Sequence, residues 1–135
     1  MAVIEWTESM KIGIAEIDAQ HKHLVELANQ FDHQIASGKP PGEIHHFLNE
    51  FIDQILVHFA TEEKHFTEYR YPGAAEHVAE HQKLALEGRE LQARLIASGG
   101  VPDAAGKRLL EKWVKEHIQG LDKAYGQWAV AQGLK

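Results

Sequence analysis

The chain has 135 residues, of which 44% are hydrophobic and 25% charged, and its formal net charge is −6. This length fits one domain with a sizeable core, and the negative charge argues against nucleic acid and anionic membrane surfaces as partners. The absence of cysteine excludes disulfides, thiolate ligands and iron–sulfur clusters. The N-terminus lacks a signal-peptide pattern and no apolar run approaches a membrane span, so we expect a cytoplasmic protein.

Residues 1–17 are expected to form an extended arm, which Trp6 and Ile14 anchor to the rest of the chain. Asp18 is a candidate N-cap for a first helix over residues 18–37, because its carboxylate can accept hydrogen bonds from the free N–H groups of a first turn. Residues of the expected buried face recur at steps of three and four, the period of an amphipathic helix. They are Ile17, His21, Leu24, Ala28, Phe31 and Ile35.

Three more helices follow with the same period and are separated by short turns rich in proline and glycine. We expect them at about residues 43–69, 74–98 and 103–121, with a short helical tail over 122–135. Four amphipathic helices with short connections predict an all-α fold, an antiparallel up-down-up-down four-helix bundle with an N-terminal arm and a short C-terminal helical tail. Residues 1–135 are then a single domain.

Ten histidines are many for this length, and five of them fall at one level of the predicted bundle. Residues four apart on a helix lie one turn above each other, so each such pair can direct two donor atoms at one small volume. The expected core positions at this level are His21, His58, Glu62, His77, His81 and His117. A single buried histidine is usually a hydrogen-bonded core residue, but six such residues in one layer indicate a metal site.

The remaining histidines are expected to lie outside this site, with His65 the nearest of them. Asp122 is less easily placed, since five helical steps after His117 rotate it ~140° away from the shared face. Gly120 lies between the two and would allow a bulge, a kink or the end of the helix. Spacing alone leaves both positions for Asp122 open.

Several segments together resemble the hemerythrin family in its short bacterial form. They are Trp6, Gly13, Ile17-Asp18-Ala19-Gln20-His21, His58-Phe59-x-x-Glu62-Glu63, His77-x-x-x-His81 and His117-Ile118-x-x-x-Asp122. The departures are minor, such as Phe66 where a methionine is common.

This resemblance implies a non-haem di-iron centre, with two iron ions that alternate between Fe2+ and Fe3+ and share a bridging oxo or hydroxo group. It places His21 and His58 on one iron, and His77, His81 and His117 on the other. Glu62 and Asp122 would bridge the two irons.

Imidazole and carboxylate donors suit iron, and the implied ligand set leaves one coordination position open. Side chains within one turn of a ligand lean over the same face and should wall this position; they are Leu24, Phe59, Trp113 and Ile118. We therefore expect a monomeric, non-enzymatic protein that binds O2 reversibly, for storage or for delivery to an oxygen-consuming enzyme. The alternatives are an O2 or redox sensor, a di-iron peroxidase or nitric-oxide-handling enzyme, and an iron store or purely structural bundle.

Overall fold

The computed structural model describes residues 6–100 and 112–135, and for Trp113 and Val114 it describes the backbone alone. Within these residues the chain is helical and contains no strand. The elements in order are the 3-10 helix η1 (Glu8–Met10), the α-helices α1 (Ala15–Ala36), α2 (Pro41–Tyr69) and α3 (Ala74–Ser98), the π-helix η2 (Trp113–Asp122) and the α-helix α5 (Lys123–Ala131).

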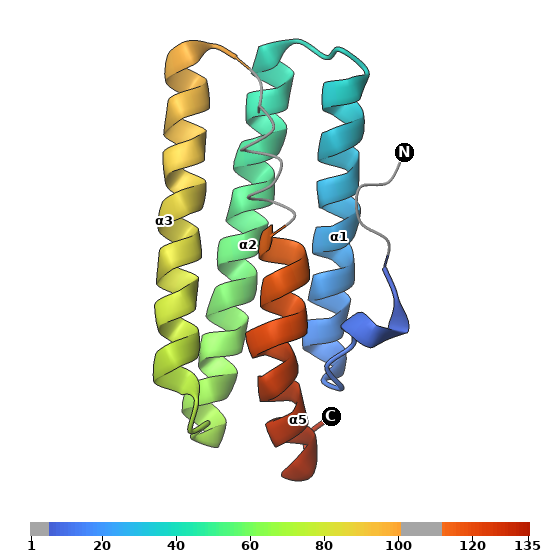
Figure 1. Cartoon of the computed structure of the whole chain (residues 1–135), viewed down its shortest axis with the longest axis vertical. Helices are drawn as coiled ribbons and strands as arrows, with labels where there is room; N and C mark the ends of the chain where they lie inside the picture. The colour runs from blue at the N-terminus through green and yellow to red at the C-terminus, as the bar shows by residue number, and fades with distance from the viewer. Residues whose placement is uncertain (1–5, 101–111) are drawn as a thin grey trace.

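The long helices lie side by side and alternate in direction, as Figure 1 shows. Helices α1 and α2 join at one end of the bundle, and α2 and α3 join at the other. Helix η2 continues directly into α5, and together they run back antiparallel to α3. The predicted all-α antiparallel bundle is confirmed. Of the expected fourth helix, residues 103–111 lie outside the described part of the chain.

The start of α1 differs from the prediction. The helix begins at Ala15 with Ile14 in the capping position, so Asp18 is not the N-cap but a residue of the first turn. Its carboxylate instead accepts hydrogen bonds from the backbone N–H groups of Ile12 (2.7 Å) and Gly13 (3.2 Å). Gly13 has a φ of +98°, a conformation that favours glycine, and the chain there can turn back over Asp18. Through these two hydrogen bonds, Asp18 connects the arm to the helix.

Helix α2 also begins earlier than predicted, at Pro41 rather than residue 43. Proline suits the first helical position because its missing N–H has no partner there in any case and its φ is already helical. Helix α3 has the predicted bounds, from Ala74 to Ser98.

The apolar core consists of three clusters of buried side chains stacked along the bundle. The cluster at the α1–α2 turn comprises Phe31, Ile44, Leu48, Ile52, Leu91 and Leu95. The middle cluster comprises Met10, Leu24, Val25, Ala28, Phe51, Ile55, Phe59, Leu84 and Ile118. The third lies at the end of the bundle that holds the α2–α3 turn, here called the arm end. It comprises Ile12, Ile14, Ile17, Phe66, Tyr125 and Ala129. The polar layer predicted from the sequence falls where the last two clusters meet: along the chain, His21 lies between Ile17 and Leu24, Glu62 between Phe59 and Phe66, and Asp122 between Ile118 and Tyr125.

The N-terminal arm packs against α5 as well as α1. The Lys123 ammonium donates hydrogen bonds to the carbonyls of Ser9 (3.3 Å) and Lys11 (2.7 Å). Trp6 packs on the middle cluster, as expected. In the tail, Tyr125 is fully buried, whereas Val130 is 50% exposed and does not belong to the core.

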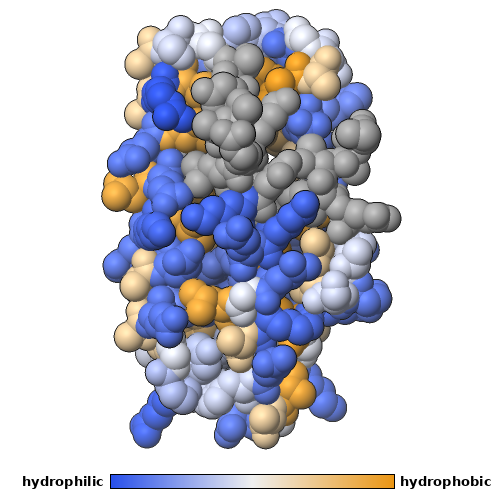
Figure 2. Space-filling model, viewed as in Figure 1, coloured by the Kyte–Doolittle hydropathy of each residue, from blue (hydrophilic) through white to orange (hydrophobic). Residues whose placement is uncertain are grey.

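The visible surface in Figure 2 is mostly hydrophilic, with hydrophobic residues scattered over it. In the part of the chain that the structure describes, no helix combines the length and the apolar character needed to cross a membrane.

Gly126 sits where the arm crosses α5, and it should tolerate no side chain. A Cβ placed there would collide with the carbonyl and side chain of Ile12. We expect Gly126→Ala to lower the free energy of unfolding by about 1–3 kcal/mol through overpacking. Gly88→Ala is the matched control, because a Cβ on that residue of α3 meets only Ile52 Cδ1, at 4.0 Å.

In the control, alanine's higher helix propensity should leave the stability unchanged or raise it by up to ~1 kcal/mol. Urea unfolding monitored by circular dichroism measures both variants. Equal midpoints for the two would contradict the close packing of the arm on α5.

Candidate metal centre

A polar layer crosses the otherwise apolar bundle. Each of its members is at most 4% exposed. Helix α1 contributes His21, α2 contributes His58 and Glu62, α3 contributes His77 and His81, and η2 contributes His117 and Asp122. These are the seven residues that the family resemblance pointed to, and the structure brings all of them together.

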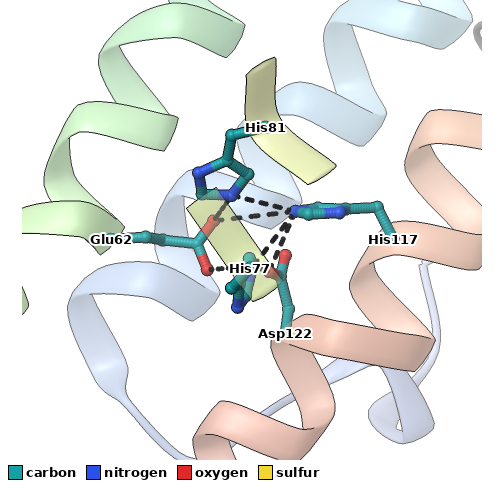
Figure 3. Close-up of side chains that lie close together, drawn as sticks. All are labelled: Glu62, His77, His81, His117 and Asp122. Atoms are coloured by element: carbon teal, nitrogen blue, oxygen red, sulfur yellow. Dashed lines mark hydrogen bonds and ion pairs between the residues drawn. The ribbon is translucent and has the colours of Figure 1, made fainter. Parts of the chain in front are cut away.

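The donor atoms of this layer form two groups, in each of which all atoms lie within 4.8 Å of one another. The larger group comprises Glu62, His77, His81, His117 and Asp122, which belong to α2, α3 and η2 and point toward one another in Figure 3. The smaller comprises His21, His58, Glu62 and Asp122. Both carboxylates therefore belong to both groups, as expected of bridging ligands, while each histidine belongs to one group only.

Asp122 reaches this layer because of the local helix type. Residues Trp113–Asp122 form a π-helix rather than an α-helix. Its hydrogen bonds run between residues five apart, so residues five apart come close to one face, as residues four apart do in an α-helix. The spacing from His117 to Asp122 matches that register, and the two side chains contact each other at 3.0 Å (His117 Nε2 to Asp122 Oδ1).

The oxygens of Asp122 are divided between the two groups. Oδ2 lies 2.8 Å from Nε2 of His21, whereas Oδ1 lies 2.7 Å from Nε2 of His77. In Glu62, by contrast, one oxygen contacts both groups. Its Oε1 lies 2.8 Å from Nε2 of His58 and 3.4 Å from Nε2 of His81. Each carboxylate thus contacts histidines of both groups.

The separations between ring nitrogens fit bound metal ions. The Nε2 atoms of His21 and His58 are 2.9 Å apart, and Nε2 of His117 is 3.2 Å from that of His81 and 3.4 Å from that of His77. Neighbouring donors at right angles around an ion bound at about 2.1 Å lie about 3 Å apart. Five imidazole nitrogens and two carboxylates directed inward at these separations suit two first-row divalent ions.

Burial and the contacts among these groups shift several pKa values in the layer. Burial, together with the charge of Asp122, raises the pKa of Glu62 well above its usual range. Burial would also raise the pKa of Asp122, but its contacts with the histidines, His117 foremost, hold it well below its usual range. Burial likewise works against the charged form of His117, yet Asp122 and Glu62 raise its pKa to about 9.

His81 behaves in the opposite way. Burial and the neighbouring ring of His117 lower the pKa of His81 to about 2, which leaves it neutral. A neutral imidazole is the form that binds a metal ion, so His81 would have no proton to lose, whereas a divalent ion would displace the protons that these shifts favour on Glu62 and His117.

The other five histidines lie outside both groups, as predicted. His23, His33 and His46 are exposed, and His45 contacts the carbonyl of Gly100 at 2.6 Å. His65 is half-buried and lies between Glu16 and the hydroxyl of Tyr125, at 3.3 Å from each.

Sequence reasoning missed two contacts on the outer side of the layer. Nδ1 of His58 lies 2.7 Å from the side-chain oxygen of Gln20, and Nδ1 of His81 lies 3.5 Å from the Glu63 carboxylate. Both partners directly adjoin a candidate ligand in the sequence. That proximity is the one signal that could have suggested them, although Gln20 contacts a histidine on a different helix from its own.

Three of the four residues expected to wall an open coordination position belong to one apolar cluster beside the layer: Leu24, Phe59 and Ile118. The Phe59 ring stacks on that of His81, with centroids 4.0 Å apart, and meets that of His117 at 5.5 Å. The side chain of Trp113, the fourth, lies outside what the structure describes.

Comparison with known proteins places the chain in a family. The family model described as "Hemerythrin HHE cation binding domain" matches residues 12–129. The chain belongs to the hemerythrin family. It is 33% identical to a bacteriohemerythrin of Pseudomonas aeruginosa, over 93% of this chain and 80% of the relative. It is 32% identical to a bacteriohemerythrin of Methylococcus capsulatus, over 93% of this chain and 96% of the relative.

The fold of this hemerythrin-family chain agrees with that assignment. A crystal structure of wild-type hemerythrin superposes with a TM-score of 0.86 at 30% sequence identity, over 93% of this chain and 97% of the other. The expected family and fold are both confirmed.

The seven-residue layer should make the stability of this hemerythrin-family chain depend on metal. Ligand binding to the folded state alone contributes about 2.7 kcal/mol at a hundredfold excess over Kd, so anaerobic Fe2+ should raise the Tm of the metal-free protein by roughly 10 °C. Glu62→Ala and His117→Ala should each abolish most of this rise, because each removes a donor that the remaining ligands cannot replace.

His45→Ala is the control: it removes a half-buried histidine that lies outside the layer. Its Tm is expected to fall slightly, with the metal-dependent rise intact. Differential scanning calorimetry with and without Fe2+ gives both quantities. If the His45 variant lost the rise as fully as the His117 variant, the sorting of candidate ligands from other histidines would be wrong.

Proposed function

We propose that this chain binds O2 reversibly at a non-haem di-iron centre held by His21, His58, Glu62, His77, His81, His117 and Asp122. The observation that carries the proposal is the pair of donor groups that share two carboxylates but contain unequal numbers of histidines. Membership of the hemerythrin family supports it. Residues 12–129, which match the family model, would form one domain with the flanking residues.

The unequal groups give the site one place for an outside ligand. Three imidazoles belong to the larger group and two to the smaller, with Glu62 and Asp122 common to both. If each ion has about six positions and one solvent oxygen is shared, the larger group is complete and the smaller lacks one donor. A single open position beside His21 and His58 is what the capture of one small molecule requires.

Two irons at these positions would supply the electrons that O2 needs in order to bind and would take them back when it leaves. The protein holds the donors in place and excludes water and anions. Leu24, Phe59 and Ile118 are buried next to the layer and present hydrocarbon surface to it. A charged species would lose its hydration on crossing such a wall, whereas neutral O2 loses almost none.

The donor set favours a carrier over an oxygenase. Di-iron bundle proteins of the ferritin-like class use carboxylate-rich ligands, with glutamates from all four helices. The layer described above has five histidines and two carboxylates, so it carries less negative charge to support highly oxidised iron. We therefore propose storage of O2, or its delivery to an oxygen-requiring enzyme, as the role of the protein.

The function is tested by loading the purified protein with Fe2+ and following the absorption spectrum through air and then argon. We expect two irons per chain, no haem, uptake of one O2 per two irons, and return of the starting spectrum under argon. An iron content of one per chain would reject the di-iron centre. Irreversible oxidation in air would exclude a reversible carrier, and steady turnover of hydrogen peroxide or nitric oxide would replace the carrier role by an enzymatic one.

The apolar wall should slow the loss of bound O2 by oxidation. Leu24→Ala opens a cavity beside the layer, so we expect the air-exposed protein to convert to its oxidised form several-fold faster, with a stability loss of about 2–5 kcal/mol. Leu91→Ala is the matched control, because Leu91 is as deeply buried (2% exposed, against 1% for Leu24) but belongs to the distant cluster.

The control should lose similar stability and keep the wild-type oxidation rate. Spectral decay is compared at a temperature at which both variants are folded and loaded with iron. Equal decay rates in the two variants would leave Leu24 with a packing role only.

A further inference from the structure

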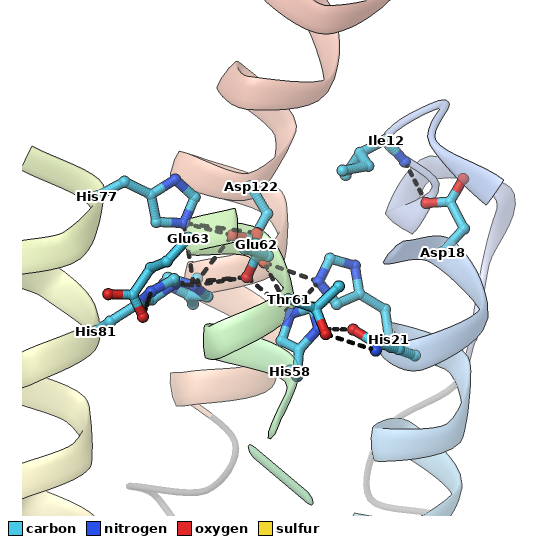
Figure 4. Close-up of polar contacts among 12 residues, drawn as sticks. Ile12, Asp18, His21, His58, Thr61, Glu62, Glu63, His77, His81 and Asp122 are labelled. Carbon is cyan, nitrogen blue, oxygen red and sulfur yellow. Dashed lines mark hydrogen bonds and ion pairs between the residues drawn. The ribbon is translucent and has the colours of Figure 1, made fainter. Parts of the chain in front are cut away.

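The outer nitrogen of His58 has a specific partner on another helix. Gln20, the residue directly before His21 on α1, places its side-chain oxygen 2.7 Å from Nδ1 of His58 on α2. The same amide donates through its nitrogen to the Thr61 hydroxyl at 3.1 Å. Figure 4 shows Thr61 beside His58, on the side of the ring away from His77. One glutamine thus connects the two helices that supply the smaller donor group.

The orientation of this amide follows from the number of protons available. The Thr61 hydroxyl has one proton and donates it to the carbonyl of Val57, at 3.1 Å. Its oxygen can then only accept from Gln20, so the NH2 group of the amide faces Thr61 and the carbonyl faces His58. An amide carbonyl cannot donate, and therefore Nδ1 of His58 carries the proton. Nε2 of His58 is left with its lone pair directed at the centre of the layer.

The two donor groups differ in the charge of the side chain that faces the outer nitrogen of a histidine. Nδ1 of His81, in the larger group, faces the Glu63 carboxylate at 3.5 Å. This contact is an ion pair and not a hydrogen bond: among the described residues, Nδ1 of His21, His77 and His81 has no hydrogen-bond partner. A neighbouring anion makes an imidazole more electron-rich and favours a more highly charged metal ion, and a neutral amide does so less. The smaller group has the neutral acceptor.

We propose that Gln20 is a positioning residue that sets both the tautomer of His58 and the reduction potential of the iron beside it. Its carbonyl fixes the proton on Nδ1, and its neutrality keeps the potential of that iron high. The reduced form, which is the one that takes up O2, is thereby retained. The inference rests on the proposed di-iron function and adds to it a residue outside the ligand set.

Exchange of the amide for a carboxylate tests the effect on the potential. Gln20→Glu should lower the midpoint potential of the iron-loaded protein, with at least a tenfold shift in the ferric-to-ferrous ratio, or about 59 mV for a one-electron couple. Gln82→Glu is the matched control, because it makes the same change of charge directly after His81, on an exposed side chain. In this control, the ferric-to-ferrous ratio should shift less than twofold. Equal shifts in the two variants, or no shift in Gln20→Glu, would overturn the proposal.

Removal of the hydrogen bonds tests the positioning. Gln20→Leu should weaken binding of one iron by about 10–100-fold, the usual effect of losing such an outer partner. Thr61→Val should weaken it in the same direction, and Thr61→Ser should restore wild-type binding because it keeps the hydroxyl. Chelator competition measures the affinities. Wild-type affinity in both Gln20→Leu and Thr61→Val would overturn the positioning role.

A measurement on the metal-free protein separates this inference from the proposed function. Nitrogen-15 NMR of the ring at alkaline pH should find His58 protonated at Nδ1 in the wild type and redistributed toward Nε2 in Gln20→Leu. A wild-type ring protonated at Nε2 would overturn the inference, whatever the iron content. A wild type that binds no iron but has the Nδ1 proton would reject the di-iron function and keep the role of Gln20 in orienting the ring.

Discussion

Seven ionisable or polar side chains are buried in one layer of this bundle, and the rest of the structure accommodates that burial. Charged groups removed from water are costly unless a partner compensates them. Here two carboxylates are surrounded by five imidazole nitrogens at 2.7–4.0 Å, yet these groups cannot all adopt the protonation state they prefer in water. Two divalent ions would satisfy the lone pairs and the negative charges at once, so the layer is best understood as a site that metal completes.

Six of the seven residues could be predicted from helical periodicity, because His21, His58, Glu62, His77, His81 and His117 fall on the buried faces of their helices at matching heights. Asp122 could not, since spacing by five suits the layer only in a π-helix, and nothing in the local residue types requires that register. The family resemblance supplied it. The N-cap assigned to Asp18 was also wrong. Gly13 turns the arm back, and the carboxylate of Asp18 accepts hydrogen bonds from backbone N–H groups outside the helix.

Contacts between helices were the least accessible to sequence reasoning. Gln20 contacts His58 across the α1–α2 interface, and Glu63 lies beside His81 across the α2–α3 interface. Each depends on how far one helix is rotated and shifted against its neighbour, which the period of a single helix does not determine. The packing of Gly126 against Ile12 is of the same kind. The faces of the helices were thus predictable, and the partners across them were not.

The placement of the polar layer between two apolar clusters also bears on how the chain folds. Leu24, Phe59 and Ile118 lie on one side of the layer, and Ile17, Phe66 and Tyr125 on the other. Without metal, these two parts of the core are joined across the layer by contacts among its own polar side chains, and the arm end holds the smaller cluster. We expect cooperativity to be weaker in that state, so that the arm end opens as a separate unit while the remainder stays folded. Amide hydrogen exchange would detect this as selective loss of protection in α5 and the first turns of α1, which metal restores by joining the two units into one.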